Sequence, residues 1–455
     1  MKVPFSLNLA AILLLMVTSA QGQSTQSVDP ITRPRVVGTV ETATASTKSQ
    51  EPASQTPSRQ QATVDKTPAA AQTPAQSRQE IVDKAPAAAQ TTAPPRQEIV
   101  DKSPAKPAAA DAARTVARED VKRLSPNRLR SRINEAERLM KAHPLPTALT
   151  PSLEYVTLAA LLPESSQIHL IRISKETFLT KGSEISAVST LGLPVQVRIV
   201  RANGVNTAVT VFDDKNRSLS PLVVEFPIER KGVFREMAYY TSAHPALLSP
   251  ELMKAGETYV NSMVDLAAKR LRDRGNPIVP SLIEIAKRLC VVEHVDHDRY
   301  RNENRVTLFE EIYTLYALNE LDTYRYAVSS AGAGGMVQMI PWTYNLMRQR
   351  HPAVGLNPDF VAGMRNHGNA LEAMLLYMQD TWNELSADLD VQSLLTAKQA
   401  TQAEIVAAGY NSNSAKLPGY IRRAGAGWRS LIPRETQLYL QIYQSVDSLM
   451  RSKEK

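Results

Sequence analysis

The chain has 455 residues, carries 53 lysine and arginine side chains against 45 acidic ones, and contains a single cysteine, Cys290. One cysteine excludes a disulfide-stapled domain, so the fold has to be stabilised by a packed core. The formal net charge is +8, but the basic residues are scattered and do not cluster with aromatic ones, which argues against a nucleic-acid-binding protein. The length is sufficient for two or three domains.

Residues 1–22 are predicted to be a secretory signal peptide. Lys2 precedes an apolar run at 9–17, and small residues follow at 18–20, an order typical of signal sequences. This run is too short for a transmembrane helix, which needs about 20 residues. We therefore expect export to the periplasm or cell envelope of a bacterium, where a basic protein is attracted to anionic surfaces.

Residues 23–120 are rich in Ala, Pro, Gln, Ser and Thr and almost lack aromatic residues. Such a segment cannot bury enough apolar surface to offset its conformational entropy, so we expect a disordered linker. It contains an imperfect repeat, which reads RQQATVDK at 59–66 and RQEIVDK at 78–84 and 96–102. Proline between the repeats argues against stacked structural units. Two interpretations remain: the repeats dock envelope partners, or they are a duplicated spacer.

Residues 121–150 are predicted to contain one docking helix. Ser125 and Pro126 form a typical start, because a capping residue is followed by proline in the first turn. Apolar residues then recur on one face until the chain reaches His143. These residues are Leu129, Ile133, Ala136 and Met140.

Residues 151–242 are predicted to form a small antiparallel β domain, because apolar and polar residues alternate there. Asn203 and Gly204 mark one turn between alternating runs. Two hairpins are expected, and their strand pairs are 195–199 with 207–211 and 223–228 with 233–237. Like the linker repeats, this domain is a candidate surface for envelope protein partners.

From residue 243 to residue 455 the apolar periodicity is helical, so we expect an all-α domain. Cys290 lies on an apolar helix face, and we expect it in the core rather than as a nucleophile. Ser281 and Glu284 predict a capping box at the start of this helix.

The same helix ends in a polar run at 293–298. His294, His297 and Asp298 could ligate a metal ion, but their order differs from that of the two-histidine zinc helices. We favour a solvated helix end, and we expect neither a metal nor a cofactor.

A second helix is predicted to end its apolar face at Glu320. A glycine-rich loop follows at 331–335, where missing side chains allow the backbone to approach a ligand closely, and an apolar run then ends at Pro341. The helix face consists of Phe309, Ile312, Tyr313 and Tyr316. The pattern predicts a desolvated acid above a glycine-walled cleft.

This stretch resembles the lytic transglycosylase domain of family 23 glycoside hydrolases, which share the goose-type lysozyme fold. In that family a catalytic Glu is followed by spaced Ala and Ser and by Gly-Ala-x-Gly-Leu-Met-Gln. The matching residues here are Glu320, Ala327, Ser329, Gly332, Ala333, Gly335 and Gln338. Two further blocks follow in the family's order, a Tyr-Asn pair and Pro-x-Glu-Thr-x-x-Tyr. Their residues here are Tyr410, Asn411, Pro433, Glu435, Thr436 and Tyr439.

The resemblance covers residues 300–447 and includes three departures from the family pattern. Leu321 stands where the family has Ser, which removes a hydroxyl next to the catalytic Glu. The other departures are Met336-Val337 in place of Leu-Met and Ser412-Asn413 in place of Ala-Gly.

The resemblance implies a multi-domain α+β protein whose C-terminal domain is lysozyme-like and binds peptidoglycan glycan strands. It implies cleavage of the β-1,4 bond between N-acetylmuramic acid and N-acetylglucosamine, with Glu320 first as acid and then as base. The product would carry a 1,6-anhydromuramoyl end. The substrate-binding residues implied are Gln338, Tyr410, Asn411, Tyr439, Ser329, Gly335 and Met336.

Two alternatives stay open. A lysozyme-like hydrolase would deliver water to the same bond, but it usually needs a second carboxylate, and none is placed beside Glu320 by the helical spacing. For that reason a substrate-assisted route through the sugar's acetamido group is preferred. The other alternative is a catalytically silent envelope scaffold, which the departures Leu321 and Ser412-Asn413 keep open.

Overall fold

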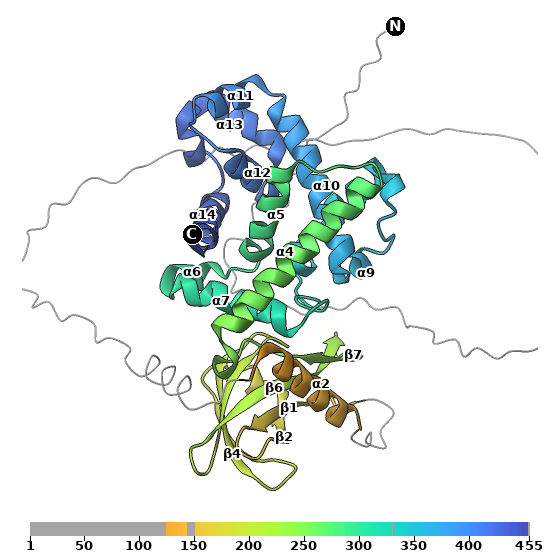
Figure 1. The fold of residues 1–455 in the computed structure, drawn as a ribbon, viewed down its shortest axis with the longest axis vertical. Helices are drawn as coiled ribbons and strands as arrows, with labels where there is room; N and C mark the ends of the chain where they lie inside the picture. The colour runs from red at the N-terminus through yellow and green to blue at the C-terminus, as the bar shows by residue number, and fades with distance from the viewer. Residues whose placement is uncertain (1–123, 143–150, 330, 454–455) are drawn as a thin grey trace, which may run out of the picture. The chain divides into compact units, whose positions relative to one another are not determined.

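The computed structural model describes residues 124–142, 151–329 and 331–453 (Figure 1). The predicted signal peptide at 1–22 and the linker at 23–120 lie outside the described residues. Within the described part of the chain, no helix combines the length and apolarity needed to cross a bilayer.

The predicted docking helix is α2, which runs from Pro126 to Ala142. Its buried residues are the four that the sequence pattern placed on one face. This face belongs to one cluster of buried residues, which includes Leu161 and Leu222 of the sheet and Leu252 and Leu318 of the helical region. The helix therefore lies where sheet and helices meet (Figure 1).

Residues 151–242 form a curled antiparallel sheet, as predicted. Its strands are β1 (Tyr155–Leu162), β2 (Gln167–Ser174), β3 (Glu184–Val188), β4 (Pro194–Arg201), β5 (Ala208–Asp213), β6 (Ser218–Arg230) and β7 (Val233–Tyr240). The strand order is β2-β1-β6-β5-β4-β3, and β7 pairs with the far half of the long β6. The sheet is curled, so its two end strands, β2 and β3, come close to each other. There the Thr190 amide, just after β3, donates to the Leu170 carbonyl of β2 at 2.9 Å.

Both predicted hairpins are confirmed. In the first, Val197 of β4 pairs with Val211 of β5. In the second, β6 and β7 are joined by Lys231 and Gly232, which both have positive φ (53° and 72°) as a two-residue hairpin turn requires.

The region from 243 onward is helical, so the chain as described is α+β. After the short α3 (Lys175–Phe178) in the sheet, the helices are α4 (Pro250–Asp273), α5 (Pro280–Val292), α6 (His297–Asn302), α7 (Arg305–Leu318), α8 (Pro341–Arg350), α9 (Phe360–Arg365), α10 (His367–Ser386), α11 (Leu389–Thr396), α12 (Gln402–Asn411), α13 (Leu417–Ala424) and α14 (Arg434–Lys453). Helix α10 is buried along most of its length and contacts α4, α5, α8, α9 and α12. The predicted capping box at Ser281 is wrong, since α5 begins at Pro280 after Val279.

Sheet and helices share one hydrophobic core and are joined by buried polar contacts. Glu311 of α7 is 6% exposed and pairs with Arg201 of β4 and, at 2.8 Å, with Arg299 of α6. The Asn319 carboxamide bonds both backbone groups of Thr241, at 2.9 and 2.8 Å. These contacts fix the end of α7 on the sheet.

The first prediction concerns this interface. Glu311→Gln removes the buried carboxylate that pairs with Arg201 and with Arg299, of which Arg299 keeps Glu303 at 2.8 Å, so we expect a loss of about 3–5 kcal/mol in the free energy of unfolding. Urea unfolding measures it. The control is Asp298→Asn, which removes an exposed ion pair with Arg301 and is expected to change stability by less than about 1 kcal/mol. Equal effects of the two changes would show that the interface does not depend on the buried carboxylate.

Candidate active site

The candidate site is centred on Glu293, the residue that follows the last turn of α5. This helix is buried over almost its whole second half, since Leu289, Cys290, Val291 and Val292 are all at most 2% exposed. It carries Glu293 into the interior, where the side chain remains only partly exposed. A carboxyl that is mostly desolvated but still reachable is a typical general acid.

Two tyrosines from distant helices gather around this carboxyl. The Tyr439 hydroxyl of α14 donates a hydrogen bond to Glu293 Oε1. Tyr410 of α12 lies within electrostatic range of Glu293, and its hydroxyl donates to the Val337 carbonyl at 2.7 Å. Burial raises the pKa of both tyrosines well above the usual value, so both are neutral donors.

Burial also raises the pKa of Glu293 to about 8. The hydrogen bond from Tyr439 lowers the pKa in part, and the negative charge of Glu435, one turn before Tyr439, raises it again. Most Glu293 side chains are therefore protonated at neutral pH, as proton donation to a leaving group requires.

The glycine-rich loop closes one side of the site. Gly335 has φ +68°, and a β-carbon there would lie 2.4 Å from the Met364 carbonyl oxygen, so no larger residue fits. Gln338 is also left-handed, with φ 45°, and its side-chain amide turns back to the Gly335 carbonyl at 2.8 Å. The loop thus presents the consecutive carbonyls of Met336 and Val337 toward α5 and α12.

Several predicted substrate-binding residues have internal roles. The Ser329 hydroxyl accepts the Ala333 amide at 3.0 Å and shapes the loop. The Met336 side chain is fully buried and packs in the core. Asn411 ends α12 directly after Tyr410 and is partly exposed. Tyr410 is also partly exposed, whereas Tyr439 is buried, at 3% exposure.

The predicted environment of Glu320 is wrong. Helix α7 ends at Leu318, because Asn319 turns to the sheet and Leu321 adopts a left-handed φ of 68°. The Glu320 side chain is 39% exposed and pairs with Arg130 of α2 at 2.6 Å. It is therefore a solvent-facing ion pair and not a desolvated acid.

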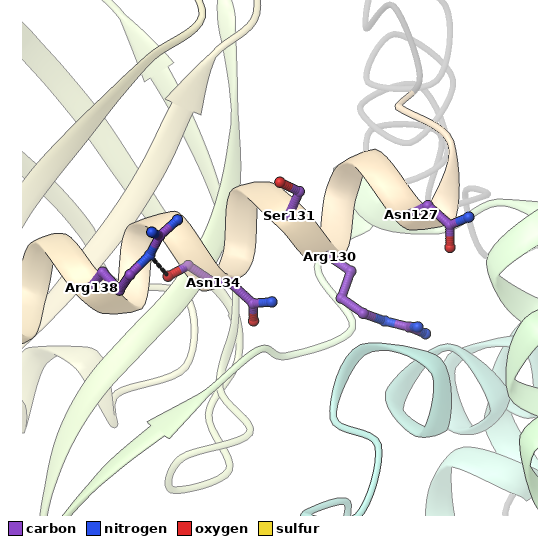
Figure 2. Close-up of a pocket in the computed structure, with 5 residues that line it drawn as sticks. All are labelled: Asn127, Arg130, Ser131, Asn134 and Arg138. Carbon is purple, nitrogen blue, oxygen red and sulfur yellow. Dashed lines mark hydrogen bonds between the residues drawn. The ribbon is translucent and has the colours of Figure 1, made fainter.

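Arg130 belongs to a polar face of α2. Figure 2 shows its side chain extending away from the helix beside Asn127, Ser131, Asn134 and Arg138, which line a surface pocket. Arg130 reaches across to the end of α7, where it also approaches the Ala317 carbonyl at 3.5 Å. Glu320 thus helps to dock α2.

The polar run at 293–298 is not the solvated helix end that the sequence suggested. Glu293 and His294 face inward, and only its far end, with Asp298, is strongly exposed. His294 Nε2 is occupied by the Met336 carbonyl, and no group of three or more side chains among the described residues is arranged to hold a metal ion. The sequence signal that could have identified Glu293 is an apolar helix that ends in a carboxylate. The same pattern occurs at Glu320, so it does not distinguish the two residues.

No family model, curated protein or solved structure matches the chain. The assignment of the site therefore depends on its geometry and on the sequence motifs.

The second prediction concerns the ionisation of Glu293. Its pKa of about 8 in the fold exceeds the value of about 4.3 expected in an unfolded chain, so the folded state binds the extra proton between these pH values. Relative to Glu293→Gln, the wild type should lose stability as pH rises through this window, by up to about 1.4 kcal/mol per pH unit. Unfolding curves at successive pH values measure the difference.

Tyr439→Phe is the matched variant for this experiment. It removes the hydrogen bond that lowers the pKa of Glu293, so the loss of stability should extend to higher pH. Parallel curves for the wild type and Glu293→Gln would mean that Glu293 ionises normally in the fold.

Proposed function

We propose that the chain is an exported peptidoglycan lytic transglycosylase with a lysozyme-like helical domain, in which Glu293 takes the role first expected for Glu320. One observation carries the proposal. A protonated, partly exposed carboxyl lies against Tyr439 and Tyr410, which come from the two later sequence blocks that resemble the family. Residues of these blocks are associated with the substrate cleft in that family.

The chemistry requires a group that first donates and then accepts a proton. Glu293 would protonate the glycosidic oxygen as the bond to C1 of N-acetylmuramic acid breaks, while the sugar's acetamido group stabilises the positive charge at C1. The resulting Glu293 carboxylate would then take the proton of the C6 hydroxyl as that oxygen bonds to C1. The Glu293 carboxyl regains its proton, and the product is a 1,6-anhydro ring.

Tyr439 has a defined part in this cycle. Its hydroxyl donates to the Glu293 carboxyl, so it stabilises the carboxylate that exists between the two proton transfers. Because burial keeps the tyrosine neutral, it remains a donor throughout. Tyr410 acts through the loop, since it holds the Val337 carbonyl.

A second candidate is a lysozyme-like hydrolase, and one observation favours it. The negative charge of Glu435 acts on Glu293, so a second carboxylate is present near the acid, contrary to the sequence-based expectation. Glu435 is exposed at the start of α14 and could activate a water molecule. The two activities differ in the end group that they leave.

The third prediction distinguishes these two reactions. Digestion of purified peptidoglycan should give muropeptides ending in 1,6-anhydro-N-acetylmuramic acid, which has no free anomeric centre. Borohydride should therefore leave their masses unchanged, as mass spectrometry before and after reduction would record. Products dominated by ends that take up two hydrogens would contradict the transglycosylase proposal and support hydrolysis.

Glu435→Gln is the matched control. Hydrolysis would require Glu435 as the base, so its loss should abolish product formation. Transglycosylation does not, so anhydro ends should persist in this variant.

A further inference from the structure

We propose that His294 is a positioning residue of this site, which fixes the loop 335–338 against the end of α5 that carries Glu293. This inference rests on the proposed function, because it concerns the same carboxyl. His294 follows Glu293 directly in the sequence. Its backbone therefore cannot move without moving the acid.

The imidazole of His294 makes a defined hydrogen bond to the loop. Its Nε2 lies 2.9 Å from the Met336 carbonyl oxygen. A carbonyl only accepts, so Nε2 carries the hydrogen and donates it. Burial lowers the pKa of His294 to about 3, so the ring is neutral at every pH at which the enzyme would work.

Tyr324 holds the ring in this orientation. The two rings are stacked in parallel, with centroids 3.3 Å apart and 2° between their planes, and Tyr316 of α7 meets the histidine edge-on. Tyr324 has a left-handed φ of 60°, which is costly for a bulky residue. Its hydroxyl is buried without a hydrogen-bond partner among the described residues. In this structure Tyr324 therefore contacts His294 through its ring and not through its hydroxyl.

His294 and Tyr410 hold successive carbonyls of one loop. Met336 oxygen accepts from His294, and Val337 oxygen accepts from Tyr410 at 2.7 Å. Two donors on adjacent peptide groups fix both peptide planes. Loss of the first donor would free the loop and admit water beside Glu293.

The groups that face this pair come from several elements. Around Glu293 they are Tyr439 and Glu435 of α14, Tyr410 of α12 and Cys290 of α5. Around His294 they are Tyr316 of α7, Tyr324 of the turn that follows α7, and His367 of α10. Neither set contains a lysine or arginine, so the carboxyl is kept protonated by exclusion of water and by Glu435.

The experiment replaces His294 by Gln or by Asn, two amide side chains that differ only in length. His294→Gln places an amide nitrogen near the position of Nε2 and retains the donor to Met336. His294→Asn places it near Nδ1, too far from that carbonyl. The full-length variants are compared by cleavage of purified peptidoglycan and by NMR titration of the Glu293 carboxyl, whose resonance is assigned by its absence in Glu293→Gln.

The proposal predicts that His294→Gln keeps the rate within about fivefold and leaves the titration of Glu293 unchanged. His294→Asn should lower kcat by about 10- to 100-fold, and the Glu293 titration should move to lower pH as water enters. A merely structural role would lower the melting temperature without moving the titration. Equal titrations in the two variants would overturn the proposal.

A second pair of variants tests the proposal if His294→Asn does not fold. Tyr324→Phe keeps the stacked ring and should behave as the wild type. Tyr324→Asn removes the ring at a left-handed position that Asn tolerates, and it should reproduce the downward shift in the Glu293 titration. If the wild type does not cleave peptidoglycan, the proposed function fails, whereas the titrations still decide whether His294 positions the site.

Discussion

The site depends on one contact, the hydrogen bond from Tyr439 to Glu293 at the end of α5. It joins a carboxyl carried by a buried helix to the last long helix of the chain. The carboxyl is desolvated enough to hold its proton at neutral pH, and the tyrosine stabilises the carboxylate once that proton is given up. Helix α14 thus contributes, together with α12, to keeping the end of α5 away from solvent.

Packing between the other helices and the sheet holds the elements around this contact in place. Gly256 of α4 lets α7 approach so closely that a β-carbon there would lie 1.8 Å from the Tyr313 carbonyl oxygen. The end of α7 is then fixed to the sheet through Asn319 and Thr241. Beyond it, the turn that contains Tyr324 brings that ring onto His294. The sheet is therefore connected to the site through α7, and sheet and helices share one core.

Local patterns predicted the local structure well. The hairpin turn at Lys231-Gly232 and the apolar face of α2 follow from residue types and spacing within a few residues. The capping box at Ser281 failed because Pro280 fits the first turn of α5 better, and Glu284 instead pairs with Lys287 and Arg288.

The choice between the two carboxylates could not be made from local patterns. Both Glu293 and Glu320 follow apolar helices. Glu293 is covered because α12 and α14, far away in the sequence, pack over the end of α5, whereas Glu320 faces solvent beside Arg130 of α2. These long-range contacts determine whether a carboxyl side chain is buried, and burial in turn determines its pKa. The sequence pointed to the tyrosines of the two later blocks as candidates, and the structure places them near Glu293 and not near Glu320.

The most direct test of this account is a comparison of Glu293→Gln with Glu320→Gln on peptidoglycan. Both changes replace a carboxyl by a nearly isosteric amide, and circular dichroism confirms that each variant is folded. The account predicts that Glu293→Gln loses a factor of about 100 to 10,000 in the rate of glycan cleavage. Glu320→Gln should stay within a few-fold of the wild type, because only an exposed ion pair is lost. An inactive Glu320→Gln together with an active Glu293→Gln would contradict the account. Glu320, after the end of α7, would then be the catalytic acid.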